Sequence, residues 1–163
     1  MLDAFVSWLQ TTALSHAIVS YLWVWPAAET AHFIGLALII GTVGFFDLRL
    51  AGAFKSVPVS AAHDLMPFAL VGFAVNGLTG LIFLIGHPEQ YAHNVAWWWK
   101  VACLALAGLN AVVFELTIGK RTALLGAGDD TPVAAKAIGV ISILAWFGVL
   151  FWGRMLPFIG SAF

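Results

Sequence analysis

Four long apolar stretches limit what this chain can fold into. They cover about residues 27–48, 65–86, 95–118 and 134–158. A helix needs about 20 apolar residues to cross the hydrocarbon core of a bilayer, and backbone exposed to lipid must satisfy its own hydrogen bonds. We therefore expect four membrane-spanning helices. The sequence has 163 residues, so residues 1–163 are predicted to form a single all-α domain, an integral membrane four-helix bundle.

The composition agrees with a protein surrounded by lipid. Hydrophobic residue types make up 62% of the sequence and charged residues 9%, against about 25% charged in a typical soluble domain. So few charges do not cover a surface in water. The formal net charge is −1 and the longest basic run is Lys120-Arg121, which excludes the basic surface that binding of nucleic acid requires. The lipid bilayer is the expected partner.

Basic residues near the ends of the spans predict the orientation of the bundle. Most lie in or beside the loops after the first and third spans: Arg49, Lys55, Lys120, Arg121 and Lys136. Cytoplasmic loops carry an excess of Lys and Arg, so these two loops are predicted to be cytoplasmic. The N-terminus, the 87–94 loop and the C-terminus are then predicted to be periplasmic, in the inner membrane of a bacterium.

Residues 3–24 are apolar but interrupted too often by polar side chains for a lipid-facing span. The interruptions are Asp3, Gln10, Thr11, Thr12, Ser15, His16 and Ser20. This pattern predicts an amphipathic helix lying in the outer interface of the membrane. A fifth span is the alternative.

Histidine is the most informative polar residue type in the sequence. The chain contains His16, His32, His63, His87 and His93, and in the predicted orientation all but His63 lie toward the outer side. His32 is about 8 Å inside a first span that starts near Ala27, at 1.5 Å per residue. Ionisable groups at such depth need a partner and usually mark function. The alternative for His32 is a structural hydrogen bond to a neighbouring helix.

Glycines near these histidines suggest a flat cofactor. Gly35 lies one turn from His32, and Gly80 lies two turns before His87 on the same helix face. A haem b between the first and second spans, with His32 and His87 as axial ligands, fits this pattern. The alternative for the glycines is close helix packing. His16, His93 and His63 are further candidate ligands; His63 is either a surface histidine or a ligand of a second haem.

Two basic side chains near the outer boundary suit the propionates of a haem. Lys100 and Arg154 belong to the third and fourth spans, and each can form a charge-assisted hydrogen bond with a carboxylate. Snorkelling to the interface is the alternative for Lys100, which follows three tryptophans. Copper is the competing cofactor, because His16, His32, His87 and His93 offer several imidazoles to a transition metal.

A motif in the first span resembles a family of small bacterial four-helix membrane proteins of largely unassigned function. The motif is Trp23-Val-Trp25-Pro26-x-x-Glu29-x-x-His32-x-x-Gly35, followed by Gly41, Asp47-Leu-Arg49-Leu-x-Gly52, Thr79-Gly80, Lys100 and Ala107-Gly108-Leu-Asn110. The resemblance covers about residues 20–115. It implies a four-span fold, distantly similar to transmembrane b-type cytochromes and copper-resistance membrane proteins. His32 falls on a motif position, Arg49 and Lys100 on recurrent charged positions, whereas the other four histidines depart from the pattern.

These features together predict a transmembrane b-type cytochrome that transfers electrons and has no substrate of its own. Its role would be to ligate the iron, orient the haem and tune its potential, with a redox protein or a quinone as partner. A copper-handling membrane protein and a structural subunit of a respiratory complex are the alternatives. Small residues in the third span, Ala107, Gly108 and Ala111, further predict a homo-oligomer.

Overall fold

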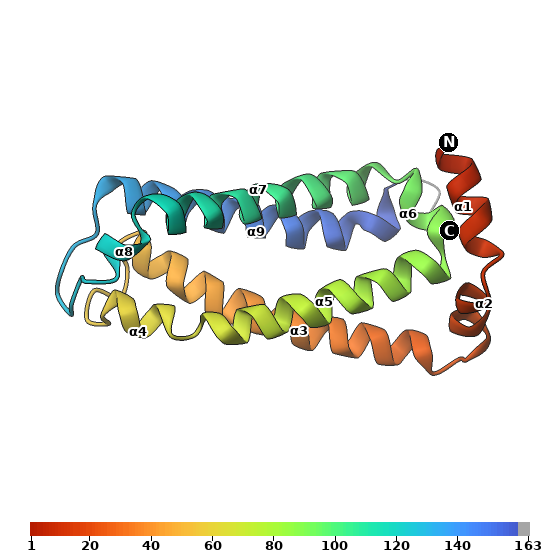
Figure 1. Ribbon diagram of the computed structural model, residues 1–163, viewed down its shortest axis with the longest axis horizontal. Coiled ribbons are helices and arrows are strands. Elements are labelled where there is room, and N and C mark those ends of the chain that lie inside the picture. The colour runs from red at the N-terminus through yellow and green to blue at the C-terminus, as the bar shows by residue number, and fades with distance from the viewer. Residues whose placement is uncertain (160–163) are drawn as a thin grey trace.

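The computed structural model describes residues 1–159 and consists of helices joined by short loops (Figure 1). Four long helices run side by side: α3 (Val24–Leu50), α5 (Met66–Gly86), α7 (Val95–Thr117) and α9 (Val133–Met155). Each includes a stretch that is long and apolar enough to cross a membrane. The predicted all-α four-helix bundle is therefore confirmed.

The ends of the long helices lie close to the predicted limits of the spans. α3 begins at Val24 and ends at Leu50, slightly beyond the predicted 27–48. α9 ends at Met155 and is followed by a 3-10 turn, η1 (Leu156–Phe158). Pro157 explains this early end, because proline has no backbone N–H for the next helical hydrogen bond and restricts the residue before it.

The N-terminal segment differs from the single amphipathic helix expected over residues 3–24. It forms two short helices, α1 (Leu2–Gln10) and α2 (Ala13–Ser20), which lie across one end of the bundle (Figure 1). The chain breaks at Thr12, whose hydroxyl accepts a hydrogen bond from the backbone N–H of Ser15 and caps α2. Helices of nine and eight residues extend about 14 Å, less than half of the hydrocarbon core. The fifth-span alternative is therefore wrong.

The long helices form two closely packed pairs, α3 with α5 and α7 with α9, and the pairs meet where α3 packs against α9 (Figure 1). Glycines permit the close approaches. A Cβ placed on Gly72 would lie 2.6 Å from the carbonyl oxygen of Gly35, and one on Gly139 would lie 2.6 Å from that of Asp47. α5 and α7 do not form a packed pair, and both cavities described below lie between them.

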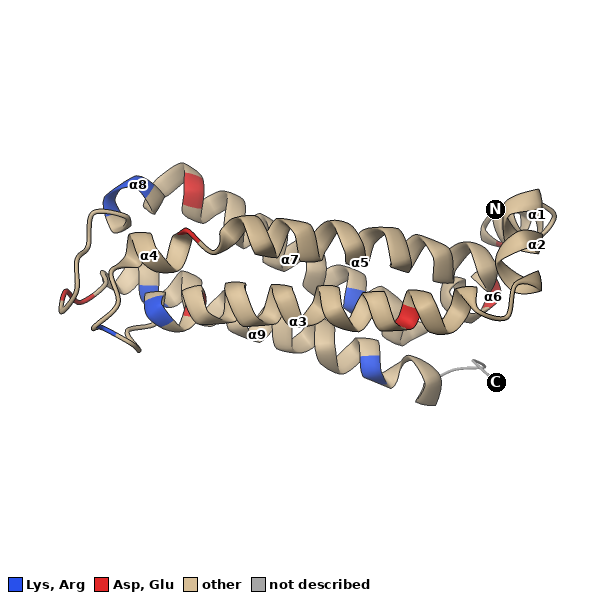
Figure 2. Cartoon of the chain, turned by 90° about the horizontal axis from the view of Figure 1, so that it is seen from below, with Lys and Arg blue, Asp and Glu red and all other residues tan. Residues whose placement is uncertain are grey.

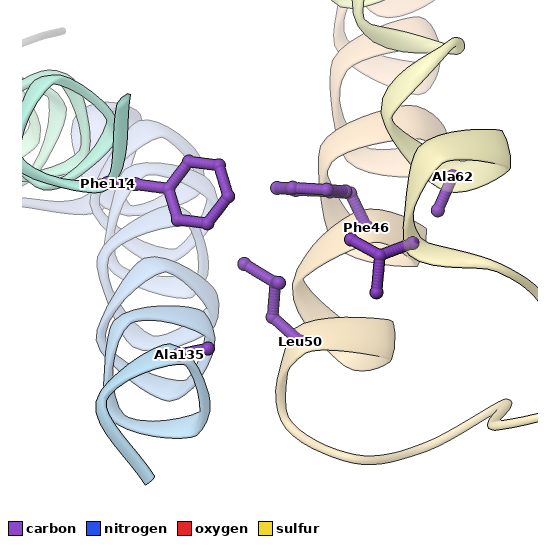
Figure 3. Packing of buried hydrophobic residues seen from close by; sticks show 6 residues of the cluster. Phe46, Leu50, Ala62, Phe114 and Ala135 are labelled. Carbon is purple, nitrogen blue, oxygen red and sulfur yellow. The ribbon is translucent and has the colours of Figure 1, made fainter. Parts of the chain in front are cut away.

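One end of the bundle, called here the α8 end, is closed by two short helices and an apolar cluster. α4 (Val59–His63) precedes α5, and α8 (Gly119–Thr122) follows α7. The buried cluster (Figure 3) draws on α3, α4, α7 and α9: Phe46, Leu50, Val59, Ala62, Phe114 and Ala135. The rings of Phe46 and Phe114 meet edge to face with centroids 5.4 Å apart. This contact links the two helix pairs.

Arg49 ties the loops of the α8 end to α3. Its side chain is fully buried, and Nε donates a hydrogen bond to the carbonyl oxygen of Val57 at 2.6 Å. Nη2 donates to the carbonyl oxygens of Asp129, at 3.0 Å, and Gly126. The predicted cytoplasmic loops after the first and third spans are thus held together by one guanidinium.

Most Lys and Arg residues lie at this α8 end (Figure 2). Lys136 and Lys55 both pair with Asp130, at 2.8 and 3.0 Å, and these contacts hold the pKa of the Asp130 carboxyl at about 2. The opposite end, called here the α6 end, carries α1, α2 and α6 (Pro88–Ala92). The charge distribution underlies the predicted orientation, with the α8 end in the cytoplasm, which remains a prediction.

Candidate cofactor site

A cavity of about 890 Å³ lies between the two helix pairs, toward the α6 end. Its volume is within the range of about 300–1,000 Å³ that is usual for small-molecule and cofactor sites. Most of the lining is apolar, as expected for such a site. The polar side chains around this α6-end cavity are Glu29, His32, Asn76, Gln90, Tyr91, Lys100 and Arg154.

His32 is held in one wall of the cavity by a hydrogen bond between helices. Its Nδ1 lies 2.7 Å from the hydroxyl oxygen of Thr79 on α5. The Thr79 hydroxyl also lies 2.8 Å from the carbonyl oxygen of Val75, and this carbonyl can only accept. When the hydroxyl proton is directed to Val75, the Thr79 oxygen accepts the N–H of His32; when it is directed to Nδ1, the hydroxyl donates to the imidazole.

In either arrangement Nδ1 is engaged, and the contact orients the imidazole. A neutral His32 with its proton on Nδ1 carries a lone pair on Nε2. Metal-bound histidines typically donate their other ring N–H to a fixed acceptor, which orients the ring. His32 and Thr79 have this relationship when the ring proton is on Nδ1. The Phe83 ring also packs against the imidazole, with centroids 5.4 Å apart.

Two basic side chains reach the same cavity from the other helix pair. Lys100 belongs to α7 and Arg154 to α9. Lys100 lies along Gly153, where an added Cβ would be 3.7–3.8 Å from its terminal atoms. Arg154 is exposed, and its guanidinium lies 5.2 Å from the ring centre of Phe158. The structure therefore places His32, Lys100 and Arg154 around one cavity.

The two glycines expected to make room for a haem occupy different environments. Gly80 lines the cavity, and a Cβ added there would meet no atom within 4 Å; the same is true of Gly77. Gly35 instead packs against α5, where an added Cβ would collide with Asn76 and with the carbonyl oxygen of Gly72. Gly80 thus borders open space, whereas Gly35 serves the close helix packing that the sequence left as the alternative.

His87, the expected second ligand beside His32, is not part of the cavity lining. Its Nδ1 lies 3.2 Å from Glu89, and its ring meets Trp25 edge to face with centroids 5.1 Å apart. Trp25 does line the cavity. The structure therefore places His87 behind the wall and does not bring it together with His32.

The remaining outer histidines lie near the N-terminal helices. His93 pairs with Asp3 of α1 at 2.9 Å, and His16 is an exposed residue of α2. Gln10 also donates a hydrogen bond to Glu89, at 2.7 Å. These contacts dock α1 on the 87–94 loop.

Within residues 1–159 no three His, Cys, Asp or Glu side chains lie close enough together to hold a metal ion, so the imidazole set expected for copper is not assembled there.

His63 lies at a second cavity of about 560 Å³, toward the α8 end. Its Nε2 is 3.2 Å from the carboxylate of Glu115, and its ring packs edge to face on Phe46. Asp47 also borders this α8-end cavity and is buried, with Oδ2 lacking a hydrogen-bond partner among the described residues. The two cavities share four lining side chains, Ile39, Phe73, Leu104 and Trp146.

Two polar residues of the site had no role assigned from the sequence. Thr79 belongs to the Thr79-Gly80 motif, and its position within the second span, three residues after Asn76, is the sequence feature that points to it. Tyr91 lies in α6 and lines the cavity. Burial, together with the charges of Glu29 and Glu89, raises the pKa of Tyr91 to about 12. Its phenol is therefore neutral at physiological pH.

Comparison with known proteins gives no further guide to function. No protein-family model, no curated protein and no solved structure matches this chain. A fold such as a four-helix bundle hosts many unrelated functions, so the function has to be inferred from the residues of the site.

Proposed function

We propose that this protein is a membrane-embedded b-type cytochrome that binds haem in the α6-end cavity and carries electrons, with His32 as an axial ligand. The observation that carries the proposal is the hydrogen bond between His32 and Thr79, which engages Nδ1, so that Nε2 is the ring nitrogen that could bind a metal. Iron in a bound haem would supply the one-electron couple.

The rest of the cavity supports this choice of cofactor. Haem is a large, mostly apolar ring with two carboxylates at one edge, and the cavity combines an apolar lining with Lys100 and Arg154. Gly77 and Gly80 leave two positions of the α5 wall without a side chain, and both border open space. The protein's part is to bind and orient the ring, exclude water from it and set the potential of the iron through its ligands and their hydrogen bonds.

Absorption spectroscopy of the purified protein tests the proposal. A reduced-minus-oxidised spectrum with a b-type α-band is expected, and His32→Ala should remove most of the bound haem. His63→Ala is the matched control, because His63 lies at the other end of the bundle, and it should keep the haem. Wild-type protein without haem, or equal haem content in wild type and His32→Ala, would overturn the proposal. Copper without haem would instead favour a copper-handling protein. Protein that contains neither haem nor copper would favour a structural subunit.

We further propose that copies of the chain assemble into a homo-oligomer in the membrane. Gly108 and Ala111 are exposed and line the α8-end cavity between α5 and α7, next to the buried Ala107. Helices of a neighbouring copy would cover this opening through small residues. Native mass measurement in mild detergent should give an oligomer, and Gly108→Leu should give monomers. Monomers of the haem-loaded wild type would contradict the assembly without affecting the haem proposal.

A further inference from the structure

The α6-end cavity offers one histidine, although a low-spin b-type haem usually has two axial ligands. His32 is the histidine in the lining, and the other four lie outside it. A second ligand for the same iron must come from another residue type of the lining, or from a histidine that moves. The lining contains no methionine or cysteine, which are the other common soft ligands of haem iron.

Lys100 lies on the wall opposite His32. α3 and α7 are diagonal in the bundle, since each packs against α9 but the two do not pack against one another. Both side chains line the cavity, His32 from the α3–α5 pair and Lys100 from the α7–α9 pair. Axial ligands have to approach iron from opposite faces of the ring, and diagonal helices supply this geometry.

The amine of Lys100 has no competing partner among the described residues. No carboxylate lies within 4 Å of its Nζ, and no hydrogen bond from it is formed within residues 1–159. A cation held away from water inside a membrane is costly without a partner. A neutral amine that donates its lone pair to a metal avoids this cost.

Tyr91 is the other conceivable ligand of the lining, and its chemistry is less suitable. Tyrosine binds haem iron as the phenolate, and the pKa of Tyr91 is raised to about 12 by burial and by Glu29 and Glu89. The carboxylate of Glu29 is already engaged by the indole N–H of Trp25, at 3.1 Å. Lys100 is therefore the side chain best placed to face His32.

We propose that Lys100 supplies the second axial ligand, through Nζ, to a haem whose first ligand is His32. Arg154 is then the cation that pairs with a propionate. This inference rests on the proposed haem function and changes the role of Lys100 from a propionate partner to an iron ligand. It also explains why His87 can take part in the contacts with Glu89 and Trp25 rather than in ligation.

Substitutions that separate charge from ligation test the proposal. Lys100→Arg keeps the positive charge but removes the ligating amine, so it should convert the oxidised haem from low spin to high spin in absorption and electron paramagnetic resonance spectra. Lys100→His should restore a low-spin spectrum. Lys120→Arg is the matched control, because it makes the same exchange at an exposed lysine of α8 that does not line the cavity, and it should remain low spin. A low-spin spectrum of Lys100→Arg identical to that of wild type would overturn the proposal.

A measurement on the unmodified protein does not depend on the variants folding. The chain has four lysines; Lys55 and Lys136 pair with Asp130, Lys120 lies in α8, and none of these three lines the cavity. Protein grown with nitrogen-15 lysine should therefore show hyperfine coupling between the low-spin iron and a labelled nitrogen, which only Lys100 can provide. Bound haem without such coupling would refute lysine ligation. Absence of haem altogether would instead refute the proposed function.

Discussion

Nδ1 of His32 on α3 lies 2.7 Å from the hydroxyl oxygen of Thr79 on α5. Both residues lie within predicted spans, where water is scarce and a polar group without a partner is costly. The contact therefore has two effects. It links α3 to α5 inside the membrane, and it orients the imidazole so that Nε2 is available at the cavity.

Removal of the Thr79 hydroxyl should weaken cofactor binding without abolishing it. Thr79→Val keeps the shape of the side chain but leaves Nδ1 of His32 without its hydrogen-bond partner. Loss of such a supporting hydrogen bond typically reduces metal-site affinity about 10- to 100-fold, and we expect a loss of this size in haem titrations. Thr42→Val is the control, because the Thr42 hydroxyl bonds to backbone within α3, at Leu38. Equal haem affinity of both variants and wild type would show that Thr79 does not support the ligand.

Close packing of α3 on α5 predicts a large difference between two glycine substitutions. Gly72→Ala places a Cβ 2.6 Å from the carbonyl oxygen of Gly35, and overpacking of this kind costs about 1–3 kcal/mol. Gly41→Ala meets no atom within 4 Å and should leave stability unchanged or slightly raised, since alanine favours helix. Denaturation in mixed detergent micelles measures both. A stable Gly72→Ala variant would mean that the helices are farther apart than described.

The α8 end should depend strongly on Arg49. Arg49→Met removes the guanidinium that donates hydrogen bonds to the carbonyl oxygens of Val57, Gly126 and Asp129. Hydrogen bonds to a charged group contribute about 1.5–3 kcal/mol each. We expect a loss of about 3 kcal/mol or more in the free energy of unfolding. Arg121 is exposed, so Arg121→Met should change it by less than about 0.5 kcal/mol. Similar losses in the two variants would argue against the described clamp.

Tyr91 should titrate at unusually high pH. Burial, Glu29 and Glu89 raise its pKa to about 12, so between about pH 10 and 12 the folded protein keeps a proton that the unfolded chain releases. This part of the stability is complete below pH 10 and falls as the pH rises toward 12. The chain has two tyrosines, so ultraviolet titration of Tyr21→Phe reports Tyr91 alone. Glu29→Gln should lower the midpoint, and a midpoint near 10 in the parent would contradict the burial described.

The orientation can be tested with fused reporters. A reporter joined after Phe163, which lies outside the described residues, should be periplasmic, and one inserted at Gly128 in the loop before α9 should be cytoplasmic. The reason is the accumulation of Lys and Arg at the α8 end. The opposite pattern would show that the bundle is inverted, and the same location for both would show that the number of spans is wrong.

Hydrophobicity along the chain was enough to locate the spans, because each bilayer-crossing helix must satisfy its own backbone and present apolar side chains to lipid. Met66–Gly86 and Val95–Thr117 agree with the predicted 65–86 and 95–118 almost residue for residue. The N-terminal segment was less predictable. Thr12 ends one helix and caps the next, and composition alone does not distinguish such a break from one continuous amphipathic helix.

The sequence by itself determined the number and limits of the spans and singled out His32, Lys100 and Arg154 as polar residues within or beside them. Only the tertiary structure decided which of the candidates meet. Gly35 and Gly80 look alike in the sequence, yet one packs against α5 and the other borders the cavity. His87 follows α5 directly but turns to Glu89 and Trp25. The physical reason is that apolar periodicity fixes a helix in the membrane, whereas its rotation and neighbours depend on packing between helices distant in sequence.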